Sequence, residues 1–215
     1  SAADLAPELL AGGSVYQLSS NTLYEINGTI TLAAPINLND SYVTGIDTNE
    51  DVLSFPGGTV FQGNVGGSIR NITLKAAARA FNITGGTSLF IQNIIIDGMT
   101  TNVGTISGVG LYFGNIVQFI NNTNGITYSG ISSLLLSNQA WLNTNNGTFE
   151  TFTGTFGLIQ KNSGFSTVDG ADLALDVNGI TTLGTGTLLG TVFSGTTTNT
   201  VGYVRGYPAA STYTG

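Results

Sequence analysis

The chain has 215 residues, of which Gly, Thr, Asn and Ser make up 100, while charged residues account for only 8%. It contains no His and no Cys, which excludes His-based triads, thiol nucleophiles, disulfide frameworks and zinc knuckles. Five Lys and Arg residues against twelve Asp and Glu cannot neutralise a phosphate backbone, so we expect no nucleic acid partner.

The remaining composition predicts a folded chain. Hydrophobic residues make up 41% of the sequence, and disorder requires low hydrophobicity together with high charge. The longest apolar run, residues 88–97, is interrupted by Gln92 and Asn93 and is far shorter than a membrane span, so we expect no membrane partner. Because the chain starts at Ser1 without an initiator Met, we expect a processed or fragmentary chain. The end at Gly215 has no closing feature, so we also expect a longer parent chain.

Residues 1–13 form the one segment whose sequence predicts a helix. Asp4 supplies an N-terminal acceptor, Pro7 falls in the first turn, and Gly12 and Gly13 end the helix. The rest of the chain consists of short Ile, Val, Leu, Phe and Thr runs separated by Gly and Asn, which is typical of β-strands joined by turns.

A 22-residue repeat runs through the middle of the chain. Its copies are residues 68–74, 90–96 and 112–118, and a fourth copy follows at 130–136 after a shorter step. They share a central Asn or Ser at Asn71, Asn93, Asn115 and Ser133. A second series recurs between them at residues 82–85, 105–108 and 125–130. Two series that recur together predict a repeat architecture.

Each repeat is therefore predicted to form one coil of a parallel β-solenoid, in which equivalent residues stack about 4.8 Å apart. Asn tolerates the left-handed backbone of a sharp corner, and stacked Asn side chains can bond one another. The predicted interior columns are Ile72, Ile94, Ile116 and Leu134 on one side of the corner, and Ile69, Ile91, Phe113 and Ile131 on the other.

The Asn corner, the 22-residue coil and the leading helix resemble the right-handed parallel β-helix of the pectate-lyase-like superfamily. Within it, the low charge and the Thr, Asn and Gly richness resemble phage tailspike and virion-fibre proteins. The resemblance covers residues 14–145 as the parallel β-helix and implies that residues 1–13 form a capping helix. It also implies a homotrimer located on a virion surface or outside the cell. The repeat is not visible in residues 146–215, where we expect irregular coils or a small separate β element.

Three groups of side chains are candidate binding residues. Four aromatic residues, Phe90, Tyr112, Tyr128 and Trp141, could bind the flat faces of sugars, although stacked aromatics in a solenoid more often stabilise neighbouring coils. Asp47, Asn49 and Asp51 place oxygens at alternating positions, as in a calcium loop, but the Gly and Glu that an EF-hand requires are missing. Asp169, Asp172 and Asp176 form a second weak calcium candidate of the same kind.

No residue is assigned a catalytic role, and no cofactor is expected. Asp97 begins an Asp-Gly turn and could pair with a second carboxylate in glycoside hydrolysis, but ordinary turn chemistry is the favoured explanation. Pectate-lyase chemistry in the resembling family needs a basic residue near calcium-binding acids. Arg70 stands beside the Asn corner without acidic partners in the next coils.

We therefore predict a non-enzymatic virion or cell-surface protein, a spike or fibre domain used for structure and attachment to host-surface glycan or other virion proteins. A polysaccharide-degrading β-helix enzyme is the alternative. An ice- or crystal-binding solenoid is a third, suggested by the Thr-rich residues 196–200. It would require a flat Thr array at the coil spacing, and we expect no such array, because residues 196–200 do not follow the 22-residue register.

Overall fold

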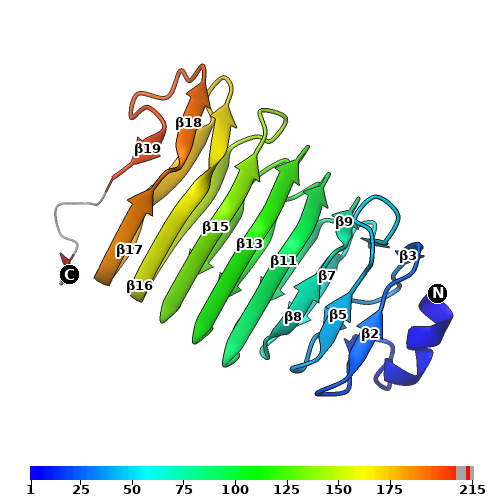
Figure 1. The fold of residues 1–215 in the computed structure, drawn as a ribbon. Coiled ribbons are helices and arrows are strands. Elements are labelled where there is room, and N and C mark those ends of the chain that lie inside the picture. The colour runs from blue at the N-terminus through cyan, green and yellow to red at the C-terminus, as the bar shows by residue number, and fades with distance from the viewer. Residues whose placement is uncertain (207–211, 214–215) are drawn as a thin grey trace.

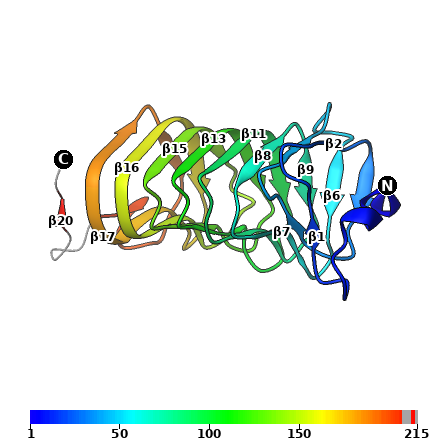
Figure 2. The same cartoon turned by 90° about the horizontal axis from the view of Figure 1, so that it is seen from below.

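The computed structural model describes residues 1–206 and 212–213 (Figure 1). After one short helix, the chain winds into a parallel β-solenoid of about eight turns, with coils of about 23 residues. The turns lie side by side along one axis (Figure 2). All pairings between named strands are parallel within the described residues, which confirms the predicted solenoid.

Each coil contributes strands to three faces, which we number in chain order. Face 1 consists of β1 (Tyr16–Gln17), β4 (Ile36–Asn37), β7 (Thr59–Gly63), β10 (Arg79–Ile83), β12 (Gly104–Ser107), β14 (Ile126–Ser129), the first parts of β16 (Thr148–Val168) and β17 (Leu173–Leu189), and β19 (Val204–Arg205). The last strand, β20 (Thr212–Tyr213), pairs with Thr182 and Leu183 of β17, which follow the face 1 part of that strand.

Faces 2 and 3 meet at the corner that the repeat predicts. Face 2 consists of β2 (Leu23–Glu25), β5 (Tyr42–Thr44), β8 (Gly67–Arg70), the first halves of β11 (Ser88–Asp97), β13 (Leu111–Ile120) and β15 (Ser133–Trp141), and later parts of β16 and β17. Face 3 consists of β3 (Thr29–Thr31), β6 (Val52–Ser54), β9 (Thr73–Lys75), the second halves of β11, β13 and β15, the end of β16, and β18 (Val192–Gly195).

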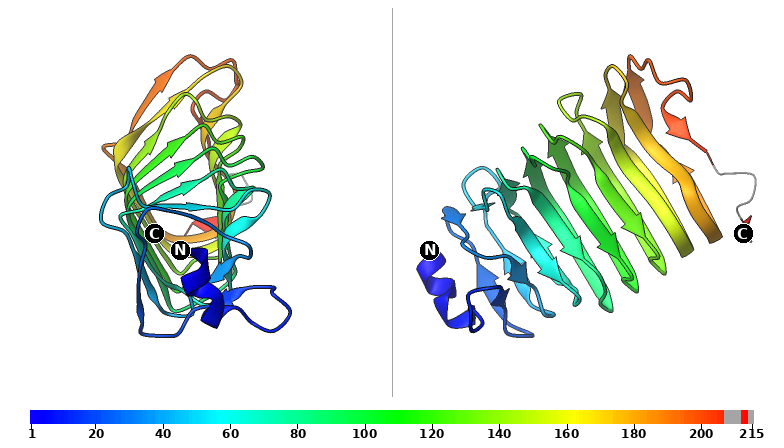
Figure 3. Two further views of the ribbon diagram at one scale, coloured as in Figure 1. Left: turned by 90° about the vertical axis from the view of Figure 1, so that its right-hand side faces the viewer. Right: turned by 180° about the vertical axis from the view of Figure 1, so that it is seen from behind.

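The N-terminal helix is a 3-10 helix, η1 (Ala2–Glu8), rather than an α-helix over the predicted range. It lies at the N-terminal end of the solenoid (Figure 3). Leu5 is buried in the core, and the Tyr24 hydroxyl donates to Glu8 Oε1. These contacts tie the helix to the first coil, at the end where an open solenoid would expose its core.

The corner residues match the prediction in two coils and then shift by one. Asn71 and Asn93 adopt left-handed φ values of 55° and 52°, and Asn93 Nδ2 donates to Asn71 Oδ1 at 2.9 Å. In the next coil the left-handed residue is Ile116 rather than Asn115, because Gln92 pairs with Asn115 and Ile94 with Val117. The coil between β11 and β13 is therefore one residue longer than the coil before it.

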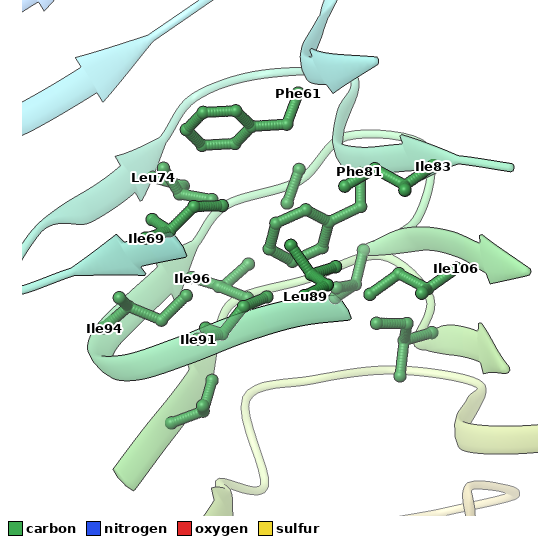
Figure 4. Packing of buried hydrophobic residues seen from close by; sticks show 14 of the residues in the cluster. Phe61, Ile69, Leu74, Phe81, Ile83, Leu89, Ile91, Ile94, Ile96 and Ile106 are labelled. Atoms are coloured by element: carbon green, nitrogen blue, oxygen red, sulfur yellow. The ribbon is translucent and has the colours of Figure 1, made fainter. Parts of the chain in front are cut away.

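This extra residue corrects the predicted interior columns. Leu134 pairs with Tyr112 in the interior, not with Ile116, which is 49% exposed. Phe113 pairs with Phe90 on the outer side of face 2, not with Ile91 in the interior. The columns predicted up to β11 are right, since Ile69, Ile91, Ile72 and Ile94 are all buried. Figure 4 shows Ile69, Ile91 and Ile94 in this core. Phe61 and Phe81 also lie in this core, with ring centroids 6.2 Å apart.

Residues after 145 continue the solenoid instead of forming the predicted irregular segment. Leu158 in β16 pairs with Ser133, and Thr185 in β17 pairs with Leu158. The stretch of chain from Ser133 to Leu158 is longer than the stretch from Asn71 to Asn93, and the stretch from Leu158 to Thr185 is longer again. These lengthening coils explain why a 22-residue period cannot be seen there. Residues 207–211 and 214–215 of the predicted C-terminal segment lie outside the described residues.

Candidate functional site

An uncharged polar ladder covers the outside of face 1. Its first row is in continuous parallel register from β7 to β16, and its second row stands two residues further along each strand. The first row consists of Gln62, Asn82, Thr105, Thr127 and Thr151, and the second of Asn64, Thr84, Ser107, Ser129 and Thr153. We call these ten residues the face 1 ladder. All ten side chains are exposed or half-buried, and none is charged.

The ladder has the geometry of a regular hydrogen-bonding array. Successive members of a row stand about 4.8 Å apart, and the two rows are separated by about 7 Å along each strand. Hydroxyl and carboxamide groups both donate and accept hydrogen bonds. The sequence does not reveal the ladder as a surface, although residues 105–108 and 125–130 are recognisable in it as repeats. Thr-Ile-Ser and Thr-Tyr-Ser, at 105–107 and 127–129, were the available signal.

A polar groove of about 220 Å³ runs beside the ladder. It is lined by Thr105, Thr127 and Thr151 from the first row, and by the carboxamides of Asn102 and Asn124. Asn102 Oδ1 is buried and has no hydrogen-bond partner within the described part of the chain. The groove therefore holds an acceptor that a bound hydroxyl could satisfy.

Three of the four predicted sugar-binding aromatics are in the core. Tyr112, Tyr128 and Trp141 are each at most 2% exposed. The Trp141 ring stacks on Phe119 with centroids 3.7 Å apart and an interplanar angle of 3°, and Tyr112 lies 5.4 Å from Tyr128. These rings pack between neighbouring coils, which is the alternative to sugar binding given for them above, and present no face to solvent.

Phe90 is half-buried and belongs to an outward row on face 2. Its neighbour in the next coil is Phe113, not Tyr112, because of the one-residue shift. The row also contains Leu23 and Tyr42, which are 62% and 51% exposed, and Leu135. We call Leu23, Tyr42, Phe90, Phe113 and Leu135 the face 2 apolar row. Ser68 interrupts it between Tyr42 and Phe90.

The predicted calcium residues close a loop by bonding to its backbone. Asp51 Oδ2 accepts from the Ile46 and Asp47 amides, and its Oδ1 accepts from Gly28 at 2.8 Å. Asp47 Oδ1 accepts from both nitrogens of Asn49. The backbone donors lower the pKa of Asp51, the Asp47 amide contributing most. The carboxylate oxygens are therefore already used within the loop.

The other candidate acids also have local partners. Asp97 Oδ2 lies 3.3 Å from Lys75 Nζ, and its Oδ1 accepts from Asn121. Asp176 pairs with Arg205 at 3.0 Å. Asp172 accepts from the Gly147 amide, and burial raises its pKa. No cluster of three or more acidic side chains suited to a metal occurs among the described residues.

Sequence reasoning also missed a charged pair inside the solenoid. Glu150 and Lys161 both point into the core from β16 and are 0% and 2% exposed. Lys161 Nζ lies 2.8 Å from Glu150 Oε2. Only the tertiary structure brings them together, because they leave β16 on different faces.

The chain matches no known protein family, curated protein or solved structure. Among the described residues, no helix has the length and apolar character to cross a membrane.

Proposed function

We propose that this chain is a non-enzymatic β-helical spike or fibre domain of a virion or cell surface that attaches to neutral host-surface carbohydrate through the face 1 ladder. This is the tailspike and virion-fibre type of protein that the sequence resembles. The observation that carries the proposal is the uncharged ladder, in register over five coils with a polar groove at its side.

The chemistry of the ladder suits a carbohydrate ligand. Sugar hydroxyls need neighbours that both donate and accept, and the Thr hydroxyls and Asn carboxamides of the ladder and groove do both. Individual contacts of this type are weak, but a repeated array lets several act on one polymer. The rigid parallel register keeps the array in place without an ordering cost on binding.

Retention on immobilised polysaccharide tests the proposal. The panel contains neutral dextran, mannan and galactan, with alginate as an anionic comparison. We expect wild-type protein to be retained on at least one neutral polymer, and a Thr105→Val, Thr127→Val, Thr151→Val variant to bind at least about tenfold more weakly, since each change removes a hydroxyl and keeps the shape. Thr29→Val, an exposed position on face 3, is the matched control.

Two results would contradict the proposal. One is no retention on any neutral polymer, and the other is full retention of the triple variant. Release of new reducing or unsaturated ends over time would instead support the alternative, a polysaccharide-degrading enzyme. The lining of the groove beside the face 1 ladder contains no carboxylate, so we place the enzyme second.

The face 2 apolar row supports the proposed homotrimer. Leu23 and Tyr42 place large apolar side chains in solvent on one face, where another copy of the chain could cover them. Light scattering should give a trimer, and Leu23→Ser with Tyr42→Ser should shift the mass toward monomer. A monomeric wild type at high concentration would contradict self-association without affecting the polysaccharide assay.

The register of Thr105, Thr127 and Thr151 also favours a second candidate, binding to ice or another crystal surface. Contrary to the expectation from the sequence, their stacking supplies a Thr column at the coil spacing, whereas residues 196–200 lie in the loop after β18. Thermal hysteresis that is lost in the triple Val variant would favour this candidate over carbohydrate attachment.

A further inference from the structure

Glu150 and Lys161 face one another across the interior of a single coil. Glu150 comes from the face 1 part of β16, stacked between Ile126 and Leu175. Lys161 comes from the face 2 part of β16 and pairs with Leu136 of the preceding coil. Their side chains are 0% and 3% exposed, and Nζ lies 2.8 Å from Oε2.

The pair is poorly compensated for two buried charges. Neither Glu150 oxygen nor Lys161 Nζ makes an aligned hydrogen bond within the described residues, although Nζ and Oε2 are in close contact. Because Nζ and Oε2 are close but not aligned for a hydrogen bond, only charge attraction stabilises the contact between Lys161 and Glu150. Buried ions without additional hydrogen bonds seldom recover their cost of desolvation.

The surroundings are apolar and aromatic. Lys161 borders a cavity of about 390 Å³ lined by Phe152, Ile159, Leu175 and other apolar side chains. Tyr128 lies 5.4 Å from Phe152. Burial raises the pKa of both Tyr112 and Tyr128, and the negative charge of Glu150 contributes to each shift. Glu150 thus shares its environment with two tyrosines that remain uncharged.

We propose that Glu150 and Lys161 condense into an intramolecular amide that braces the coil formed by β16. The reaction needs an amine held against a carboxyl group, away from water, and the 2.8 Å contact in the core provides this arrangement.

The step balances without any further reactant. A proton passes from the Lys161 ammonium to the Glu150 carboxylate, which gives a neutral amine and a neutral acid. The Nζ lone pair attacks Cδ, the Cδ–Oε2 bond breaks, and the oxygen leaves as water with protons from the acid and the amine. The product is a neutral amide, so the desolvation cost of the two buried charges is removed.

The intact mass of the purified full chain under denaturing conditions tests the proposal. We expect wild-type protein to be lighter than its sequence by one water, or to become so on incubation of the folded protein. Glu-C should fail to cut after Glu150, and fragmentation should place the missing water on a branched peptide that joins Glu150 to Lys161.

Two controls separate this cross-link from other losses of water. Lys161→Met removes the amine, so the variant should have its full sequence mass, whereas cyclisation at an Asp-Gly site such as Asp97-Gly98 would persist. The Lys75–Asp97 pair, 3.3 Å apart with Lys75 57% exposed, is a surface comparison and should stay unlinked. If Lys161→Met fails to fold, the wild-type peptide map decides alone. An unshifted mass after prolonged incubation, or a water loss located elsewhere, would overturn the proposal.

Discussion

Asn93 and Ile116 occupy the same corner position in successive coils, with φ values of 52° and 56°. They are equivalent because the residues on either side of them pair, Gln92 with Asn115 and Ile94 with Val117. A β-branched side chain is strained in this left-handed conformation, whereas Asn tolerates it. Ile116 therefore interrupts a column in which Asn71, Asn93 and Asn138 also adopt left-handed φ.

Ile116→Asn should stabilise the protein by about 1 kcal/mol, because it relieves the left-handed strain. Little burial is lost, since Ile116 is 49% exposed. Thermal unfolding measures the effect. The reciprocal Asn93→Ile should lower the melting temperature, because it adds strain and removes the 2.9 Å bond to Asn71. Equal melting temperatures for wild type and Ile116→Asn would contradict the strain argument.

Trp141→Ala should destabilise the chain by about 3–5 kcal/mol through the cavity it leaves. The Trp141 ring lies between Phe119, 3.7 Å away, and Phe149, 5.2 Å away, so the cavity would open in the middle of an aromatic stack. Denaturant unfolding provides the measurement. Phe165→Ala, at a 41% exposed position on β16, should cost much less. Similar losses for both variants would argue against the buried stack.

Protonation of Asp51 should make the folded protein less stable in acid. Its pKa is lowered in the folded chain, so its contribution is fully present above the unfolded Asp value of about 3.9 and is lost as the pH falls through the lower folded value. Asp51→Asn should lower the melting temperature at neutral pH and flatten its fall in acid. Asp47→Asn, which keeps an Oδ1 acceptor for Asn49, should change neither. Parallel pH curves for wild type and Asp51→Asn would contradict this role.

Tyr112 and Tyr128 should stay protonated in the folded protein at pH values near the ordinary tyrosine pKa of about 10, because burial raises the pKa of both phenols. Ultraviolet titration in native and denaturing buffer counts the ionising tyrosines. Tyr128→Phe should reduce the count only after denaturation. Early ionisation of all eight tyrosines would show that the core admits water.

The fold class and the coils around Asn71 and Asn93 follow from the sequence alone. The 22-residue spacing of Asn71 and Asn93 indicated the parallel stacking and the left-handed corner, because a stack of equal coils repeats the same backbone requirement at each turn. The leading helix was predicted as well, although it is a 3-10 helix and starts at Ala2.

Which side chains face outward depends on how the coils stack in three dimensions. One additional residue between β11 and β13 puts Phe113 outside and Tyr112 inside, and side chains alternate along a strand, so a slip of one residue exchanges the two faces. The same alternation turns Thr105 and Thr127 into a surface ladder. The approach of Glu150 to Lys161 follows from coil closure across the core, which strand periodicity does not encode.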